Sequence, residues 1–500
     1  MRKSVFILII VSLVARLIGY TKEFFLAFFY GTSYIVDSYI IAITIPIVVF
    51  EFFSEAIRVG FIPKYVDVSE TRGTNEANKF MNGLINLIFI ITLVLVIILV
   101  LFTKQFVMVF ASGFEGAVLK QAIKFTRIAS FAILFSGFSS IYKAYLNANG
   151  NYTFPAITLI PLNIIIIISI YLSSITNPET MILGFVVGYF VQFLILFIFV
   201  HTKNYKYIAK TSFCTLDIKN MLSLIYPIFF SVAVTDINKI INRTIASNLG
   251  EGAISSINYA SKFNSLIQSI FVLAITTVIF PIISKLASKS DYKKMSKIVK
   301  EAIEGMAIFL IPITLFLFSN SEFVVSFVFG RGAFDVDSIE STASALKYYS
   351  LGMFFVGLKQ ILNRVYYSLN DIKYPVYNSF FDMGLNIILN LLVFYFTDFG
   401  IAGLALSTSI SSIVSVIFLL FNINKKTDFN ILNLIKNIAI ISALSVVIIA
   451  LYNVLFNNMI NIITNETIVF GLSVLIAFVV YFFMLVIFRL EGVKFLTNYI

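Results

Sequence analysis

Residues 84–102 read LINLIFIITLVLVIILVLF, an apolar run that contains no charged side chain. A helix needs about 20 such residues to cross a hydrocarbon core about 30 Å thick, and this run has that length. Residues 157–175 and 468–488 form runs of the same kind. None of them shows the period-two alternation of a membrane-barrel strand. The sequence therefore predicts an all-α polytopic membrane protein.

The composition of the whole chain agrees with that class. Of the 500 residues, 59% are hydrophobic and 12% are charged, and the mean hydropathy is +0.97. Soluble domains carry roughly 25% charged residues. The net charge of +11 does not indicate a nucleic-acid partner, because the basic residues lie mainly in short connections between apolar runs, where they set membrane topology.

The sequence contains few residues or motifs that would bind a cofactor or catalyse a reaction. The single cysteine, Cys214, has no partner for an internal disulfide, and the single histidine, His201, forms no metal cluster. No Walker-type phosphate loop occurs, and the connections are too short for a catalytic domain. We therefore expect no cofactor, no metal and no catalysed reaction.

Breaks at Gly, Asn, Pro and charge clusters divide the chain into about fourteen spans. The segment after Met1 resembles the start of a signal peptide, but it carries Arg16, Lys22 and Glu23 and no cleavage site, so we expect a retained first helix. The predicted helices cover residues 4–29, 35–61, 79–102, 117–147, 154–173, 180–201, 219–248, 252–284, 299–318, 337–368, 375–396, 400–422, 432–455 and 468–488.

Lysine and arginine are concentrated in alternate connections, which predicts that both termini are cytoplasmic. The opposite connections hold little beyond Lys104, Lys120 and Arg331. The basic set comprises Lys64, Arg72, Lys79, Lys203, Lys206, Lys210, Lys219, Lys285, Lys289, Lys293, Lys294, Lys297, Lys300, Lys373, Lys425, Lys426 and Lys436.

An internal repeat organises the predicted helices. Residues 137–155 recur as 357–375 at a constant offset of 220 residues, and Gly31 recurs near Gly250. The repeat predicts an N-terminal lobe over residues 1–203, a C-terminal lobe over 204–424 and two additional helices over 425–500. Six intervening spans preserve orientation, so the lobes should enclose a central cavity about an axis normal to the membrane.

Several ionisable residues fall inside predicted spans, where an unpaired charge costs at least about 2.5–3.5 kcal/mol. Their spacing places them on shared faces of helices one, two, seven and eight. A cavity lined by such cations suits phosphate or pyrophosphate. The residues are Arg16, Lys22, Glu23, Asp37, Glu51, Glu55, Arg58, Asp236, Lys239, Arg243 and Lys262.

Structural roles remain open for some of these charges. Glu55 with Arg58, and Asp236 with Lys239, have the i,i+3 spacing of internal salt bridges. Snorkelling explains intramembrane cations near helix ends equally well. This alternative applies to Arg127, Lys143, Lys359 and Arg364. The basic run 285–300 is expected to form a basic helix at the inner membrane surface that attracts anionic headgroups, although a solvated loop that only sets topology is the favoured role.

Four motifs resemble the MurJ/MviN family of lipid II flippases, within the multidrug, oligosaccharidyl-lipid and polysaccharide exporter superfamily. Their order and spacing over nearly the whole chain carry the resemblance. They are Ala15-Arg16-Leu-Ile-Gly19-Tyr-Thr-Lys22-Glu23, Gly31-Thr-Ser-Tyr-Ile-Val-Asp37 through Pro46, Asn258-Tyr-Ala-Ser-Lys262 with Phe280-Pro281, and Gly330-Arg-Gly-Ala-Phe334 with Tyr374-Pro375.

The resemblance implies a V-shaped pair of lobes that opens alternately to the cytoplasm and the exterior. The family's cavity arginines correspond to Arg16, Lys22 and Lys262, and its acidic positions to Glu23, Asp37 and Glu55. This chain departs from the family by having Phe50-Glu51 where an Arg-Arg pair is common. A cation site described for some members corresponds to Asn242, Asn386, Asn390 and Thr408, and the loss of acids there argues against sodium coupling.

The predicted function is translocation of an undecaprenyl-pyrophosphate-linked saccharide, with lipid II as the leading substrate, across a bacterial inner membrane. Arg58 and Arg243 are added to the expected substrate-binding residues, and Asp236 to the expected gating acids. Expected partners are the lipid-linked saccharide, membrane lipids and cell-wall synthesis proteins. The alternatives are a flippase for O-antigen or capsule precursors, a multidrug or cation antiporter, a membrane-embedded transferase and a scaffold without transport.

Overall fold

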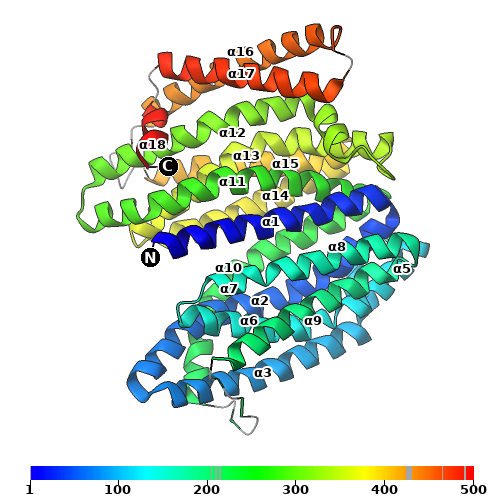
Figure 1. Ribbon diagram of the computed structural model, residues 1–500, viewed down its shortest axis with the longest axis vertical. Coiled ribbons are helices and arrows are strands. Elements are labelled where there is room, and N and C mark those ends of the chain that lie inside the picture. Colours follow the sequence, from blue (N-terminus) through cyan, green and yellow to red (C-terminus); the bar gives the residue numbers. More distant parts are fainter. Residues whose placement is uncertain are drawn as a thin grey trace. The chain divides into compact units, whose positions relative to one another are not determined.

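The computed structural model describes residues 2–499 except 204, 206, 209–210, 213–214, 424–428, 430, 464 and 489–490. Cys214 and four loop lysines of the topology prediction, Lys206, Lys210, Lys425 and Lys426, lie outside the described residues. The described chain forms eighteen α-helices and no strand (Figure 1), which confirms the predicted all-α class.

The helices follow one another along the chain with short connections. Their bounds are α1 Arg2–Tyr30, α2 Tyr34–Arg72, α3 Thr74–Leu101, α4 Thr103–Phe110, α5 Gly116–Ala129, α6 Ala132–Ala148, α7 Thr153–Ile157, α8 Leu159–Ile175, α9 Glu179–His201, α10 Leu216–Ser247, α11 Ala253–Ser288, α12 Tyr292–Phe329, α13 Val336–Ser368, α14 Lys373–Phe396, α15 Gly400–Ile423, α16 Ile431–Met459, α17 Glu466–Ile487 and α18 Glu491–Tyr499.

Many of these helices can cross a membrane. Among the described residues, ten are long and apolar enough, and the bent pair α5 and α6 makes eleven if it counts as one span. Every one of the fourteen predicted ranges overlaps helix along most of its length. The total of fourteen spans stays a prediction.

Two helices that we predicted as continuous are interrupted. The predicted helix 117–147 bends by 40° between α5 and α6. The hydroxyls of Thr126 and Ser130 donate to backbone carbonyls four residues earlier, both at 2.7 Å, and such local bonds bend helices. The predicted helix 154–173 is interrupted at Thr158, whose hydroxyl donates to the carbonyl of Pro155 at 2.8 Å.

Other helices run past the predicted ends. We ended the second helix at residue 61, but α2 continues to Arg72 because Tyr65 and Val68 extend its buried face. The ninth predicted helix, 299–318, lies inside a longer α12 for the same reason, with Met295 buried near its start. Hydropathy marks where a helix leaves the membrane and not where it stops being a helix.

Three further predictions need correction. The basic run 285–300 does not form a helix of its own, because α11 ends at Ser288 and α12 begins at Tyr292 within it. The short helices α4 and α18 occupy segments for which we predicted no helix. Both are too short to show a decisive apolar period in the sequence.

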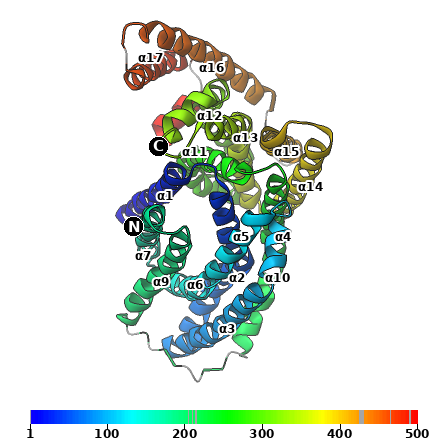
Figure 2. The same cartoon turned by 90° about the vertical axis from the view of Figure 1, so that its right-hand side faces the viewer.

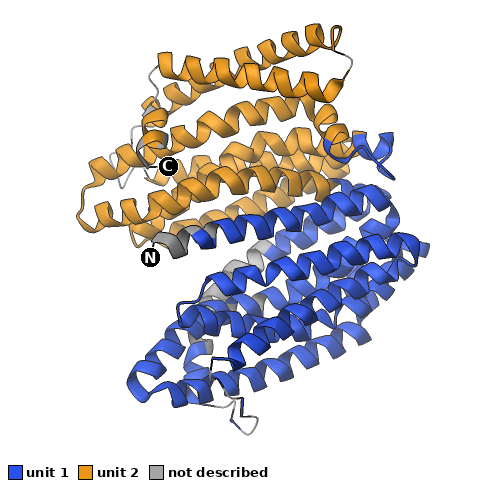
Figure 3. Ribbon diagram, viewed as in Figure 1, with its two compact units in different colours: residues 1–256, 328–339 blue, residues 257–327, 340–500 orange. Residues whose placement is uncertain are grey.

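The chain divides into two compact units (Figure 3). Unit 1 comprises residues 1–256 and 328–339, and unit 2 comprises residues 257–327 and 340–500. The predicted division at residues 203 and 424 remains a prediction.

Aromatic residues fill the core of unit 1 where α2, α6 and the segment after α9 meet. Helices α2 and α6 run side by side there (Figure 2). Tyr65 stacks on Phe61 with ring centroids 5.3 Å apart and meets Tyr145 edge-on at 5.5 Å. Tyr145 also contacts Tyr205 at 5.6 Å. These edge-on and stacked contacts hold α2, α6 and the segment after α9 together.

Helices α8 and α9 approach each other closely in unit 1. Gly184 of α9 lies against Ser169 of α8, and a Cβ at residue 184 would overlap the serine side chain. Glycine is therefore required at this crossing, as is common where membrane helices pack tightly.

A buried carboxylate ties three helices together in unit 2. Glu304 of α12 is 0% exposed and accepts hydrogen bonds from the amide of Asn437 at 2.7 Å and from the backbone N–H of Gly492 at 3.2 Å. Lys300 Nζ lies 3.7 Å from the same carboxylate. Glu304 thus holds α16 and the start of α18 against α12, and α16 runs beside α17 (Figure 1).

Candidate functional site

Charged side chains of α2 and α10 meet inside unit 1. Lys239 Nζ lies 2.8 Å from Asp236 Oδ1 on its own helix and 3.1 Å from Glu51 Oε2 on α2. Asp236 is buried, whereas the side chains of Lys239 and Glu51 are 45% and 42% exposed. The i,i+3 ion pair that the spacing suggested is formed, and Glu51 is a second partner that no spacing could reveal.

Glu55 and Arg58 also pair, one turn apart on α2. The Arg58 Nε donates to Glu55 Oε2 at 2.8 Å, and its Nη2 contacts the other carboxylate oxygen. This bidentate geometry is the one in which guanidinium and carboxylate bind most strongly. Arg58 could therefore contact a phosphate only by sharing or exchanging this partner. Arg243 lies one turn beyond Lys239 on α10, partly buried.

The charges on α1 occupy different environments. Glu23 is buried, and Lys22 Nζ lies 3.3 Å from its Oε1. Arg16 lies two turns earlier on the same helix with its side chain exposed. Among the described charges on α1, Arg16 is thus the one most accessible to a ligand.

Asp37, near the start of α2, caps the beginning of α11. Its side chain is 1% exposed and accepts the backbone N–H groups of Gly252 at 2.7 Å and Ser255 at 2.8 Å. The first N–H groups of a helix lack intrahelical acceptors and carry partial positive charge, so a carboxylate binds there favourably. Asp37 therefore joins two segments that are more than 200 residues apart in the chain.

Three connections of unit 1 gather around this cap. The hydroxyls of Thr32 and Ser338 are 2.7 Å apart, and the Ala333 N–H donates to the Phe28 carbonyl at 2.8 Å. The backbone N–H of Tyr34 donates to Glu251 Oε1 at 2.9 Å. The α1–α2, α10–α11 and α12–α13 connections are thus bonded to one another.

Glycines shape two of these connections. Gly31 and Gly250, which lie in the connections after the first helix of each predicted half, have φ values of +57° and +108°. A Cβ at residue 31 would also clash with the carbonyl of Ala333. A left-handed backbone in close contact with a neighbouring loop requires glycine.

Four predicted site residues belong to unit 2: Lys262, Asn386, Asn390 and Thr408. Asn386 Nδ2 donates to Thr408 Oγ1 at 3.2 Å, and Asn390 Nδ2 donates to Asn386 Oδ1 at 3.1 Å. The predicted cation residues of α14 and α15 are therefore neighbours. Asn242 belongs to unit 1, and Lys262 lies exposed on α11 in unit 2, so their convergence with the other predicted residues stays a prediction.

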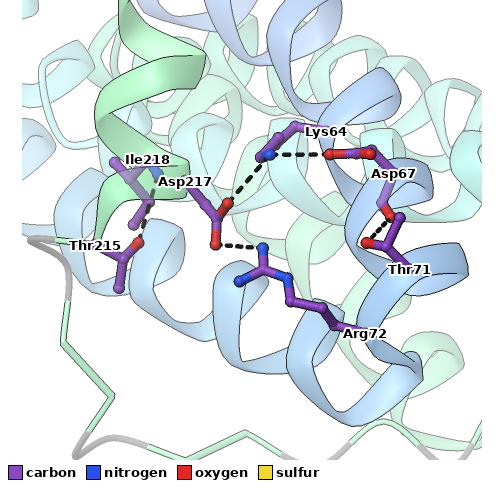
Figure 4. Close-up of polar contacts among 7 residues, drawn as sticks. All are labelled: Lys64, Asp67, Thr71, Arg72, Thr215, Asp217 and Ile218. Atoms are coloured by element: carbon purple, nitrogen blue, oxygen red, sulfur yellow. Dashed lines mark hydrogen bonds and ion pairs between the residues drawn. The ribbon is translucent and has the colours of Figure 1, made fainter.

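One ion network lies outside the apolar spans, and Figure 4 shows it. Asp217, in the first turn of α10, contacts Lys64 Nζ at 3.1 Å and Arg72 Nη2 at 2.6 Å, both from the end of α2. Lys64 also lies 2.9 Å from Asp67. Burial alone would raise the pKa of the Asp217 carboxyl, but the hydrogen bonds from Arg72 and Lys64 outweigh burial and lower it.

Sequence reasoning assigned no function to Lys143, for which snorkelling was an equal explanation. The structure instead places Lys143 in a polar pocket of unit 1, with its Nζ 3.1 Å from Gln192 Oε1. The available signal was a lysine on a helix that also carries Ser136, Ser139 and Ser140. Such a signal becomes specific only when the facing helix is known.

The many apolar helices, with ion pairs and hydrogen-bonded loops among them, define a polytopic membrane protein. A sequence model of the family described as "Lipid II flippase MurJ" matches residues 26–479 of the chain. The chain belongs to this family. It is accordingly a multi-pass protein of the bacterial inner membrane.

Individual relatives agree with that assignment. A protein of Buchnera aphidicola subsp. Baizongia pistaciae named "Probable lipid II flippase MurJ" is 27% identical over 433 residues, covering 85% of this chain and 84% of its own. The "Lipid II flippase MurJ" of Burkholderia cenocepacia is 25% identical, covering 83% of this chain and 82% of its own.

Solved structures point the same way. The structure described as "Lipid II flippase MurJ, inward closed conformation" has a TM-score of 0.82 and 28% identity, and it covers 96% of this chain and 98% of its own. An inward-facing multidrug resistance transporter of the MATE family has a TM-score of 0.70 at 13% identity, covering 86% of this chain and 96% of its own. That second likeness shows a shared fold alone.

Proposed function

We propose that the chain moves lipid II from the cytoplasmic to the outer leaflet of the bacterial inner membrane. The family match over residues 26–479 is the observation that carries this proposal. The structural match to a lipid II flippase over 96% of the chain supports it independently of motif similarity. The substrate is a lipid-linked saccharide, and its transport requires no covalent chemistry from the protein.

An apolar groove in unit 2 has the chemistry that such a substrate needs. It measures about 380 Å³ and lies between α11, α12, α16 and α17. Its walls include Phe271, Phe309, Phe316, Phe470 and Phe478. A surface of aromatic and aliphatic side chains suits the isoprenoid tail of the substrate, whose burial is favourable without hydrogen bonds.

The proposed roles of the charged residues follow from charge and position. Transport proceeds by alternating access between an N-terminal lobe, residues 1–203, and a C-terminal lobe, residues 204–424. Residues 425–500 add two helices after the second lobe, and both termini are cytoplasmic. The acids gate the pathway, and cell-wall synthesis proteins are proposed partners. The pyrophosphate is held by Arg16, Lys22, Lys262, Arg58 and Arg243, and the gating acids are Glu23, Asp37, Glu55 and Asp236.

A flipping assay in liposomes tests the proposal. Purified protein is reconstituted with headgroup-labelled lipid II, and leaflet exchange is followed by quenching from outside. Arg16→Ala is expected to slow exchange strongly, because Arg16 is exposed on α1 and a charge-assisted phosphate contact contributes about 1.5–3 kcal/mol. A matched control is Lys79→Ala, which removes an exposed lysine paired with Glu76.

A second labelled lipid tests whether the protein prefers the alternative substrate. The Phe50-Glu51 departure removes two positive charges that the family commonly has, which leaves a precursor of O-antigen or capsule as the alternative. An undecaprenyl-pyrophosphate oligosaccharide without peptide serves as that probe. Faster exchange of this lipid than of lipid II would favour the alternative, and exchange of neither by folded protein would reject the flippase.

A further inference from the structure

A pocket with mixed polar and apolar walls lies between α2, α6 and α9 in unit 1, and the proposed function gives it no role. Its volume is about 200 Å³. The polar groups facing it come from all three helices: Glu51 and Ser54 from α2, Ser140 and Lys143 from α6, and Gln192 from α9. Phe50, Phe185 and Tyr189 supply aromatic walls.

Lys143 brings an ammonium group into this pocket. Its Nζ contacts the neutral carbonyl of Gln192 at 3.1 Å, and within the described part of the chain no carboxylate lies close enough to pair with it. By contrast, Lys359 on α13, the corresponding helix of the second half, pairs with Asp382. Cations in membrane helices normally pair with an anion. The charge of Lys143 is therefore available to an anion from outside the protein.

The other polar groups of the pocket are compatible with an anionic ligand. Glu51 is the one acidic residue among those lining the pocket, and it is engaged by Lys239 at 3.1 Å. The hydroxyls of Ser54 and Ser140 are 3.1 Å apart and can turn their protons toward a ligand. Ammonium and hydroxyl donors together match the acceptor oxygens of a carboxylate or phosphate.

The size of the pocket limits what it can hold. Complete small-molecule sites measure roughly 300–1,000 Å³, so a pocket of about 200 Å³ fits one group of a larger molecule. We propose that the Lys143 pocket binds an oxyanion carried by the headgroup of the transported lipid, as a contact in addition to the basic residues named above for the pyrophosphate. This inference rests on the proposed function. The oxyanion is either a carboxylate of the headgroup peptide or the pyrophosphate.

Two substitutions test the subsite in the full-length protein in lipid nanodiscs. Lys143→Met removes the ammonium while keeping the length of the side chain. Gln192→Glu places a carboxylate beside Lys143 and supplies an internal counter-ion with almost no change in shape. Lys143→Arg keeps the charge, and Lys124→Met is a control at an exposed lysine on α5 that pairs with Glu179.

Binding is measured with three probes: lipid II, lipid II with amidated carboxyl groups, and undecaprenyl pyrophosphate. Both Lys143→Met and Gln192→Glu are expected to weaken lipid II binding about 10-fold or more, the usual effect of losing a charge-assisted hydrogen bond. Lys143→Arg should restore most of the affinity, and Lys124→Met should change none of it. Melting temperatures verify that each variant is folded.

The probes separate the two sources of the oxyanion. Weakening confined to lipid II with free carboxyl groups supports a peptide carboxylate, and weakening that extends to undecaprenyl pyrophosphate supports the pyrophosphate. If wild type binds lipid II and both folded variants bind all three probes equally well, the subsite is overturned and the flippase proposal stands. If wild type binds none of the probes, both proposals are rejected.

Discussion

At the level of single residues, Asp37 is the clearest case of a carboxylate that accepts hydrogen bonds from backbone N–H groups distant in the sequence. Asp37→Asn removes one of two acceptor oxygens that bind the N–H groups of Gly252 and Ser255. We expect a loss of about 1.5–3 kcal/mol, the usual contribution of a hydrogen bond to a charged group. A lower melting temperature in detergent measures it.

The control for this prediction is Asp67→Asn, which changes a carboxylate that is 55% exposed and paired with Lys64. An exposed pair contributes about 0–1 kcal/mol, so this variant should melt close to wild type. Equal melting of Asp37→Asn and Asp67→Asn would show that the cap on α11 does not stabilise the protein.

Residue pairs within one helix could be predicted from the sequence, whereas pairs between helices could not. The spacing of Glu55 and Arg58 suggested an ion pair because helical periodicity fixes residues i and i+3 on one face, and the structure forms it. The bond from Gly252 to Asp37 spans 215 positions, and no local period encodes it. Lys143 was ambiguous for the same reason, since its partner Gln192 lies on another helix.

At the scale of elements, Asp217 connects the first turn of α10 to the end of α2 through Lys64 and Arg72 (Figure 4). Asp217→Asn should destabilise the protein at pH 7 by about 0.5–2 kcal/mol, because two partly exposed ion pairs are lost. The pKa of Asp217 is lowered in the folded state. Its contribution is therefore complete above the unfolded value of about 3.9 and is lost as the pH falls through the lower folded value.

Melting curves of wild type and Asp217→Asn across pH 7 to 2.5 measure this dependence. The difference between the two proteins should be constant from neutral pH down to about pH 4 and should shrink below it, as the wild-type carboxyl becomes protonated. Since Arg72 is 47% exposed, added salt should also reduce the difference at pH 7. A difference that persists at the lowest pH would contradict an ionic origin.

The sequence predicted where helices occur more accurately than it predicted the residues at which they begin and end. Apolar runs located helix at every predicted range, because a span needs about 20 apolar residues whatever surrounds it. The extension of α2 to Arg72 escaped prediction because it depends on burying Tyr65 and Val68 against other helices. The bend near Ser130 escaped it because it depends on local hydroxyl bonds of Thr126 and Ser130, which an apolar pattern does not reveal.

At the scale of the whole molecule, the question is which gradient drives transport. The predicted cation residues Asn386, Asn390 and Thr408 form a chain of neutral amide and hydroxyl groups in unit 2. No cluster of three or more His, Cys, Asp or Glu residues that could hold a metal occurs in the described part of the chain. A cation buried among neutral groups alone pays a large desolvation cost that a carboxylate would offset.

We therefore expect lipid flipping to be independent of sodium. Replacing Na⁺ by K⁺ on both sides of the liposome should leave the rate unchanged, whereas a membrane potential can act on charges in the pathway with about 2.3 kcal/mol per charge per 100 mV. Asn386→Asp is the matched variant, because it places a carboxylate 3.2 Å from Thr408 without changing side-chain size. If wild-type flipping slows severely in K⁺, neutral oxygens at this position suffice for coupling; if only Asn386→Asp acquires sodium dependence, the missing carboxylate explains why wild type lacks it.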